Sequence, residues 1–517
     1  MKVVSNVLLE VYDNDISENG KFIVPDNVTR IGDSTFYGCK SLEEVVIPNS
    51  VTEIGNYAFS GCKSLKEVVI PNGVTEIGDS AFWRCESLKK VVIPNSVTTI
   101  KHHAFCECES LKEMVIPEGV TEIGNYAFSE CKSLKEVIIP ESVTEIGNYA
   151  FSGCKTLKEV VIPNGVTEIG DSAFWRCESL KKVVISESVT VIGYTVFARC
   201  KSLEGVVIPN SVTTIKHHAF CECESLKEIV IPESITEIGD YAFWGCKSLE
   251  EVTIPNSVTE IGDYAFWGCE SLKKVVIPES VTIIGYTVFG RCKSLEGVVI
   301  PNSVTTIKNN AFCECESLKE IVIPESVTEI GNYAFSGCKS LKEVVIPNGV
   351  TEIGNSVFNS CESLTIIYWS DKAYSVRCID RYCMYILTTK NWDGYTISKC
   401  TYFPDSSNEI VYVVEKDGFS VHGSSVRKAV TDWQFKCMEH VDVSEHIARI
   451  AQQGYMDAND YRLLTGACQQ GTDHFLQEHN LTWDDTMPVE EVLKITEGFY
   501  GFEKFQEAVK EILSYNT

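Results

Sequence analysis

The side chains of this sequence with the richest chemistry are its cysteines and histidines. The chain has 23 Cys and 9 His. These residue types bind zinc, form disulfides, or act as nucleophile and base in catalysis. Their densest cluster is the segment TTIKHHAFCEC, which occurs at 98–108 and again at 213–223. The first copy places four candidate zinc ligands close together, namely His102, His103, Cys106 and Cys108.

A third copy of this segment argues against a metal site. Residues 305–315 have the sequence TTIKNNAFCEC, so Asn309 and Asn310 replace both histidines while Cys313 stays. Cys108 also belongs to a repeated column of cysteines that should face the core. We therefore predict no metal site and no other cofactor.

Cys468, near the C-terminus, is the other candidate for chemistry, because a cysteine nucleophile needs a histidine nearby. The same region contains His440, His446, His474 and His479. No nucleophile signature surrounds Cys468 (LLTGACQQGTDHF), and Cys437 with His440 and His446 does not match a zinc spacing. No glycine loop that could cradle a phosphate is found. We predict no catalytic residues, with a repeat-guided enzyme in the C-terminal region as the alternative.

The elements that must position all these residues come from one internal repeat. From Pro25 to Trp369 the chain repeats every 23 residues, which makes 15 units. Four columns do not vary: Ile from Ile31 to Ile353, Phe from Phe36 to Phe358, Cys from Cys39 to Cys361, and Leu from Leu42 to Leu364. Proline fills its own column in every unit except one, where Ser186 stands. A fixed period of this kind is typical of a solenoid.

The pattern within one unit predicts two short strands. Alternate side chains of a strand face opposite ways, so Val68 and Ile70 should point inward while Glu67 and Val69 point outward. Proline follows at position 71 and ends the strand. Residues 74–77 predict a second strand, followed by a turn at 78 and a brief helical turn that carries Phe82 and Cys85 inward. A single unit is too small to fold alone, so the units must stack and share one apolar interior.

The string IP-x-x-V-T-x-I-G-x-x-A-F-x-x-C-x-S-L closely resembles the BspA-like, Treponema-type leucine-rich repeat, over residues 25–369. The resemblance implies a curved solenoid of α/β-type repeats with a parallel sheet along one face. It also implies a binding or adhesion role, since many relatives lie on bacterial or protist surfaces and contact host proteins. The first reading is therefore a non-catalytic protein-binding scaffold, and a surface adhesin is the alternative.

Composition narrows the possible partners. The net charge of −27 disfavours nucleic acid and anionic membranes as partners. A protein partner with a basic surface is one interpretation of this charge, and the alternative is that the charge only keeps a long array soluble. No apolar run approaches the ~18 residues that cross a bilayer. Met1–Glu10 has no cleavage site of the secretory type, so we expect a cytoplasmic protein with reduced thiols. Surface display remains the alternative that the resemblance implies.

The outward columns of the strand are the first candidate binding surface. The column of Glu67 holds Glu in nine units and Lys in three, and the column of Val69 holds Val in 12. Together they predict an acidic row beside an apolar row, for which we select Glu67, Val69, Glu113, Val115, Glu136, Ile138, Glu159 and Val161. The alternative is that valine serves strand formation and glutamate serves solubility.

A second candidate is the position after the invariant Phe. It is tryptophan at Trp83, Trp175, Trp244 and Trp267, and tryptophan is common at binding hot spots. The same column also accepts Ser, Cys, Ala, Gly and Asn, so it is not part of the core. The alternative is that these rings only cover a neighbouring loop.

The period also predicts the domain organisation. Residues 1–24 should form an N-terminal cap and residues 25–369 the solenoid. Residues 370–517 lack the period and are long enough for a core of their own. Their pattern predicts an α+β domain, with strands at about 370–420 and helices at about 424–515.

Overall fold

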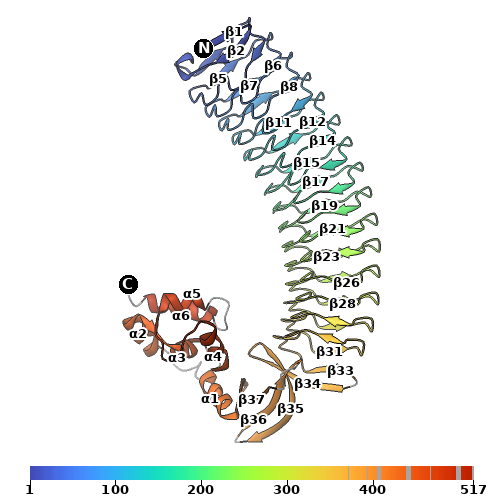
Figure 1. Cartoon of the computed structure of the whole chain (residues 1–517), viewed down its shortest axis with the longest axis vertical. Helices are drawn as coiled ribbons and strands as arrows, with labels where there is room; N and C mark the ends of the chain where they lie inside the picture. The colour runs from blue at the N-terminus through green and yellow to red at the C-terminus, as the bar shows by residue number, and fades with distance from the viewer. Residues whose placement is uncertain are drawn as a thin grey trace. The chain divides into compact units, whose positions relative to one another are not determined.

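The computed structural model describes residues 1–370, 372–392, 394–404, 409–437, 444–465, 467, 469–496 and 502–514. It has two compact units. The first comprises residues 1–339 and 347–354, and the second comprises residues 340–346 and 355–517. Residues 1–339 stack as a gently curved column of coils (Figure 1).

Each coil of the first unit contributes one short strand to each of two parallel ladders. The first ladder consists of three-residue strands: β3 (Lys21–Ile23), β5 (Glu44–Val46), β7 (Glu67–Val69), β9 (Lys90–Val92), β11 (Glu113–Val115), β13 (Glu136–Ile138), β15 (Glu159–Val161), β17 (Lys182–Val184), β19 (Gly205–Val207), β21 (Glu228–Val230), β23 (Glu251–Thr253), β25 (Lys274–Val276), β27 (Gly297–Val299) and β29 (Glu320–Val322). In these strands the two end residues face outward and the middle residue faces inward, as in β7.

The second ladder consists of two-residue strands: β4 (Arg30–Ile31), β6 (Glu53–Ile54), β8 (Glu76–Ile77), β10 (Thr99–Ile100), β12 (Glu122–Ile123), β14 (Glu145–Ile146), β16 (Glu168–Ile169), β18 (Val191–Ile192), β20 (Thr214–Ile215), β22 (Glu237–Ile238), β24 (Glu260–Ile261), β26 (Ile283–Ile284), β28 (Thr306–Ile307), β30 (Glu329–Ile330) and β32 (Glu352–Ile353). Where neighbouring strands of a ladder pair, the register is 23 residues, for example Val68 with Val91 and Thr99 with Glu122. The first ladder is interrupted between β9 and β11 and between β13 and β15, and the second between β24 and β26.

The interior between the ladders is filled by the invariant columns. The phenylalanine side chains from Phe36 to Phe335 stack face to face, with ring centroids 4.8–5.7 Å apart. Each of these rings has 0% exposure, as do the leucines from Leu42 to Leu341. The predicted fold, a leucine-rich-repeat solenoid with one shared interior, is confirmed.

The predicted helical turn around Phe82 is wrong. Residues 78–85 instead form consecutive tight turns, in which the N–H groups of residues 81, 83 and 85 donate to carbonyls three residues back. The amides between them bond to the next coil, since Ser80, Phe82 and Arg84 donate to carbonyl oxygens 22 residues on, at 2.8–2.9 Å. Ser80 and Arg84 have φ of 54° and 60°. A helix would direct every amide into its own coil, so this segment acts as a third ladder between coils.

Residues 1–24, predicted as an N-terminal cap, form a coil whose sequence diverges from the repeat. Hairpin β1 (Lys2–Val4) and β2 (Val7–Glu10) leads into η1 (Asp13–Asp15). Strand β2 pairs with β4, and β3 with β5, both at the 23-residue register. Phe22 is 5% exposed and its ring packs edge-on against Phe36, at 5.1 Å. The coil escapes sequence analysis because Asp13 and Asn19 stand where other coils have Phe and Leu.

The second unit begins with the parallel pair β31 (Glu343–Ile346) and β33 (Ile366–Trp369). The pairing then becomes antiparallel through β34 (Lys372–Ile379), β35 (Tyr382–Trp392), β36 (Tyr395–Tyr402), β37 (Ile410–Lys416) and β38 (Phe419–Gly423). Helix α1 (Val426–Cys437) packs against this sheet through Ala429 and Trp433, and its Lys428 amide donates to the Ser425 hydroxyl.

The remaining helices have an apolar core of their own. They are α2 (Ser444–Gln453), α3 (Ala458–Thr465), α4 (Gln469–Glu478), α5 (Val489–Ile495) and α6 (Phe502–Ser514), with the short pair β39 (Tyr455–Met456) and β40 (Met487–Pro488). Ile450 and Phe505 are fully buried in that core. Within the described part of the chain, no helix combines the length and apolarity that a bilayer span requires.

Candidate functional site

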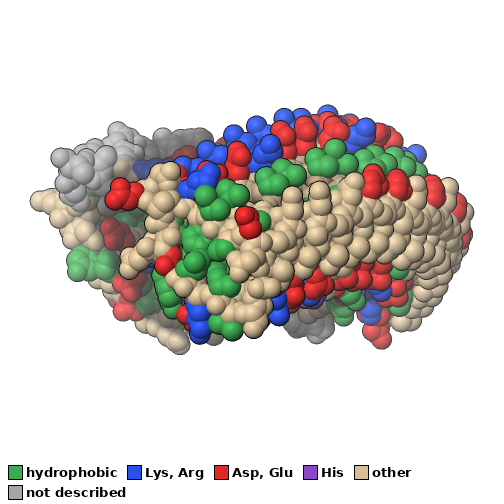
Figure 2. Space-filling model, turned by 90° about the horizontal axis from the view of Figure 1, so that it is seen from above, with side chains coloured by type: hydrophobic (Ala, Val, Ile, Leu, Met, Phe, Trp, Pro, Cys, Tyr) green, Lys and Arg blue, Asp and Glu red, His purple; other side chains and the backbone are tan. Residues whose placement is uncertain are grey.

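The outward side of the three-residue strands, which we call the strand face, carries an unbroken row of β-branched residues. In the first unit the row consists of Ile23, Val46, Val69, Val92, Val115, Ile138, Val161, Val184, Val207, Val230, Thr253, Val276, Val299 and Val322. Its apolar members are 39–76% exposed. Figure 2 shows a band of hydrophobic side chains along the solenoid with charged ones beside it. Apolar side chains this exposed in one continuous row are typical of an interaction surface.

All eight residues selected from the strand face lie on the outside of the coil. The glutamates are exposed, and Glu113 lies directly opposite Glu136 on the neighbouring strand. Valine exposure is 42–43% at Val92, Val184 and Val276, where the residue two positions earlier is lysine, and 76% at Val207, where it is glycine. Exposure does not follow the charged column alone, since Val46 is 39% and Val230 is 75% exposed although a glutamate stands two positions before each.

A row of lysines flanks the glutamate column, and the sequence analysis did not find it. It consists of Lys66, Lys89, Lys112, Lys135, Lys158 and Lys181, all exposed. Lys66 and Lys181, at the ends, pair with Glu43 and Glu204. The four lysines between them are Lys89, Lys112, Lys135 and Lys158. Among the described residues, no carboxylate oxygen lies within 4.0 Å of their ammonium groups. The signal was visible in the repeat as the residue after the invariant leucine.

In a neighbouring row of charged side chains, by contrast, most charges are paired between coils. Three residues before the lysine row, acidic and basic side chains often alternate from coil to coil and pair across them. The pairs are Lys63–Glu86, Lys132–Glu109, Lys155–Glu178, Lys201–Glu224, Lys293–Glu270 and Lys339–Glu316, at 2.7–3.4 Å. The chain therefore neutralises charge in that row, while it leaves runs of like charge on the strand face.

The two charged columns of the strand face differ between the halves of the array. Over residues 66–182 they contain eight lysines and four glutamates, which gives +4. Over residues 204–320 they contain four lysines and six glutamates, which gives −2. In the N-terminal half the predicted acidic row is therefore flanked by a lysine row, and the two columns together carry a net positive charge there.

The four tryptophans lie half-buried on the turn segments, and three of them contact an arginine. Trp83 donates from Nε1 to Glu107 at 3.1 Å, and the Arg84 guanidinium lies 4.4 Å from its ring centroid. Trp244 and Trp267 stack at 5.2 Å, and Arg291 lies over Trp267. Trp175 has Arg176 over its ring. Each ring therefore covers part of its own or a neighbouring coil.

The structure does not bring the four candidate zinc ligands together. His102 Nδ1 accepts a hydrogen bond from the Asn125 amide at 2.9 Å, and the His103 ring stacks on Tyr126 at 4.7 Å. Cys106 is buried at 7% exposure, and the Cys108 thiol donates to the Phe82 carbonyl. In the part of the chain that the structure describes, no three His, Cys, Asp or Glu side chains form a group that could hold a metal ion.

The column cysteines form a ladder of thiols inside the solenoid. Each thiol from Cys62 to Cys338 donates to the carbonyl of the phenylalanine 26 residues earlier, at 3.0–3.4 Å. Burial raises the pKa of Cys85 and Cys131 well above the ordinary thiol value. These thiols are therefore packed as small apolar groups.

The candidates near the C-terminus are only partly described. Cys468 and His440 lie outside the described residues, as do the side chains of Cys437 and His446. His474 is exposed, and His479 Nδ1 lies 2.9 Å from the Phe475 carbonyl oxygen.

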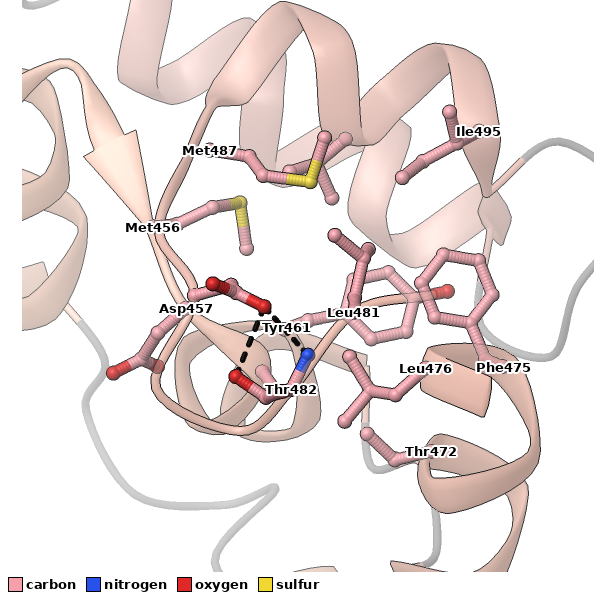
Figure 3. A pocket seen from close by; sticks show the side chains of 13 residues that line it. Met456, Asp457, Tyr461, Thr472, Phe475, Leu476, Leu481, Thr482, Met487 and Ile495 are labelled. Carbon is pink, nitrogen blue, oxygen red and sulfur yellow. Dashed lines mark hydrogen bonds between the residues drawn. The ribbon is translucent and has the colours of Figure 1, made fainter. Parts of the chain in front are cut away.

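An apolar pocket lies among helices α3, α4 and α5 of the second unit (Figure 3). Its walls include Met456, Leu476 and Met487, and at its edge Asp485 accepts hydrogen bonds from Thr482. The space inside this partly open pocket is about 30 Å³, room for a water molecule rather than a substrate.

Stacked coils, parallel ladders and an invariant apolar interior define a leucine-rich repeat solenoid. The family model described as BspA type leucine rich repeat region matches residues 15–131, 75–204, 192–319 and 305–392. These matches cover well over half of the chain, and the protein belongs to this family.

Several solved structures are similar to this chain. A leucine-rich repeat protein from Bacteroides ovatus is 33% identical, with a TM-score of 0.52 over 58% of this chain and 86% of that one. A leucine rich cell surface protein from Faecalibacterium prausnitzii is 32% identical, with a TM-score of 0.41 over 65% and 88%. The leucine rich repeat protein of Treponema pallidum is 30% identical, with a TM-score of 0.28 over 40% and 77%. No protein with a curated description matches the sequence.

Proposed function

We propose that this protein is a non-catalytic scaffold that binds another protein through its strand face. The observation that carries the proposal is the unbroken row of exposed β-branched residues from Ile23 to Val322. Beside its N-terminal half, the lysines between Lys66 and Lys181 have no carboxylate within 4.0 Å among the described residues. Burying that row would be favourable, because apolar area removed from water contributes roughly 25 cal/mol per Å².

The partner we propose is amphipathic and carries both signs of charge. Apolar side chains would lie over the valine row, cations over the run Glu113, Glu136 and Glu159, and anions over the lysine row. Complementary charges of this kind set register and association rate more than affinity. A segment with apolar and basic residues in alternation is the simplest probe of the first two rows.

The test measures binding of the full chain to a labelled synthetic peptide in which leucine and lysine alternate. Fluorescence anisotropy at low salt gives the dissociation constant. The variant E113K/E136K/E159K should weaken binding at least about tenfold, because three attractions become repulsions. The matched control is E122K/E145K/E168K, which makes the same charge change at three successive coils of the two-residue ladder.

The control variant should bind as the unmodified chain does. Equal losses in both triple variants would show that only net charge matters, and unchanged binding in E113K/E136K/E159K would remove the strand face as the site. Circular dichroism on both variants establishes that the fold is retained.

A further inference from the structure

Two cysteines of the second unit face each other across a tight hairpin. Strands β34 and β35 are joined by Asp380 and Arg381, with φ of 49° and 72°, and Cys378 pairs directly with Cys383. The pair Ile379–Tyr382 flanks the two-residue turn and takes the turn's hydrogen bond. The next pair outward is then a non-hydrogen-bonded one, in which Cα atoms are about 4.5 Å apart. That separation lies within the range that disulfides span.

The two thiols differ in exposure. Cys383 is 1% exposed, whereas Cys378 is half-buried. Cys378 lines a cavity of about 340 Å³ together with Arg377, Asp380 and Glu415. The hydrogen bond between the two thiols, followed by burial, raises the pKa of Cys383 well above its ordinary value. Cys378 is therefore the sulfur that a reagent in solution reaches first.

The Cys378 thiol donates to the Phe358 carbonyl at 3.4 Å, as the ladder thiols do to theirs. The ladder thiols differ in exposure: Cys154, which donates to the Phe128 carbonyl at 3.2 Å, and its neighbours Cys131 and Cys177 are sealed in the interior. Their side chains have 0% exposure, so no reagent reaches them in the folded chain. The hairpin pair thus combines what oxidation needs, namely an accessible first sulfur and a second sulfur already beside it.

We propose that Cys378 and Cys383 form a reversible thiol–disulfide site, oxidised by a low-molecular-weight disulfide such as oxidised glutathione. The Cys378 thiolate attacks one glutathione sulfur, which forms a mixed disulfide and releases one glutathione thiolate. Cys383 then loses its proton and attacks the Cys378 sulfur, which releases the second glutathione. Two protein thiols and one oxidised glutathione give one protein disulfide and two reduced glutathiones, so electrons and protons balance.

Closure of this bond would fasten a hairpin that already anchors the sheet. Asp380, in the turn, lies 2.7 Å from Nδ1 of His422, a fully buried residue of β38. The disulfide adds a covalent link between β34 and β35 two residues from that contact. The inference concerns the second unit alone and does not depend on the proposed binding function.

The experiment exposes the reduced full chain to oxidised glutathione at pH 8, alkylates the remaining thiols and maps the cysteines by mass spectrometry. The expected product is a peptide in which Cys378 and Cys383 are joined, and dithiothreitol should reverse it. Cys313 is the internal control, because it is also half-buried. We expect at most a glutathione adduct there.

The variant Cys383→Ser should accumulate glutathione on Cys378, because the resolving thiol is missing. The wild-type map is decisive even if that variant folds poorly. A folded chain in which Cys378 and Cys383 stay alkylated while repeat cysteines become disulfides overturns the proposal. So does a wild-type chain that stops at the adduct on Cys378.

Discussion

The invariant phenylalanine is the largest side chain in the interior of every coil. Each ring touches the ring before it and the ring after it, and Phe151 lies 5.2 Å from Phe128 and 5.4 Å from Phe174. Stacking between aromatic rings adds about 0.5–1.5 kcal/mol to what burial already contributes. Since both neighbours are also fully buried, no other residue can move in to fill the place of a lost ring.

Removal of one ring should therefore be costly. We expect Phe151→Ala to lower the free energy of unfolding by about 3–5 kcal/mol, the range for truncation of a buried aromatic. Val161→Ala in the same coil is the control, because Val161 is 56% exposed. It should cost less than about 1 kcal/mol. Guanidinium unfolding followed by circular dichroism measures both. Similar losses for the two variants would contradict the shared apolar interior.

The residue scale is also where sequence reasoning succeeded best. Phe, Leu and Cys are invariant in 15 coils, and only a buried position demands one apolar shape so strictly. The lysine row was missed for the opposite reason. Lys112 and Lys135 belong to an exposed column that also accepts glutamate at Glu204 and Glu250, so no invariance marks it. Its meaning appears only when adjacent strands place like charges side by side.

At the scale of the element, neighbouring coils approach each other closely at the glycine after the two-residue strand. A Cβ built on Gly147 would lie 2.6 Å from the Asn125 amide nitrogen and 2.7 Å from the Gly124 carbonyl carbon of the preceding coil. Glycine is needed there because the neighbouring backbone leaves no room for a Cβ atom, and not because the residue has a positive φ. Lys101, Lys216 and Lys308 fill this column in three coils, so a side chain is accepted where the neighbouring backbone moves.

Gly147→Ala should lower the free energy of unfolding by about 1–3 kcal/mol, the usual cost of overpacking a site that must move to accept extra atoms. Gly205→Ala makes the same change in a three-residue strand, where a Cβ would meet nothing within 4 Å. That variant should be neutral or slightly stabilising, because alanine restricts the unfolded chain. Thermal unfolding of the two variants side by side tests the difference. A destabilised Gly205→Ala with an unaffected Gly147→Ala would refute the argument.

The turn segment shows where the sequence is insufficient at this scale. Phe82 and Cys85 are three residues apart, a spacing that suits both a helical turn and consecutive tight turns. The two conformations differ in the acceptors of their backbone N–H groups. In this fold every second N–H group of the segment donates to a carbonyl of the next coil. Positive φ at Tyr149 and Tyr241 is equally hidden, because nothing in the residue type marks a left-handed tyrosine.

At the scale of the whole molecule, the ladder of buried thiols couples stability to pH. Burial raises the pKa of the thirteen column cysteines from Cys39 to Cys315, for Cys39 to about 11 and for the others further. In the unfolded chain these thiols titrate near pH 8.5. The folded chain therefore keeps protons at alkaline pH that the unfolded chain releases.

The sign of the effect follows from this difference. Below about pH 8 both states hold the protons, and stability is unaffected by the thiols. Above that pH each thiol whose pKa is raised lowers the free energy of unfolding by about 1.4 kcal/mol per pH unit, because only the unfolded state releases its proton. Thirteen such groups should make the guanidinium midpoint fall steeply between pH 9 and pH 11.

The double variant Cys131→Ala and Cys154→Ala isolates the thiols from the other groups that titrate in this range. It should be less stable than the unmodified chain at pH 7, because two methyl groups replace two packed thiols. Its midpoint should nevertheless fall less steeply with pH, because two of the thirteen protons no longer distinguish the folded and unfolded states. Parallel pH curves for the two proteins would show that the thiol ladder has no part in alkaline unfolding, and that tyrosine and lysine titration accounts for the whole effect.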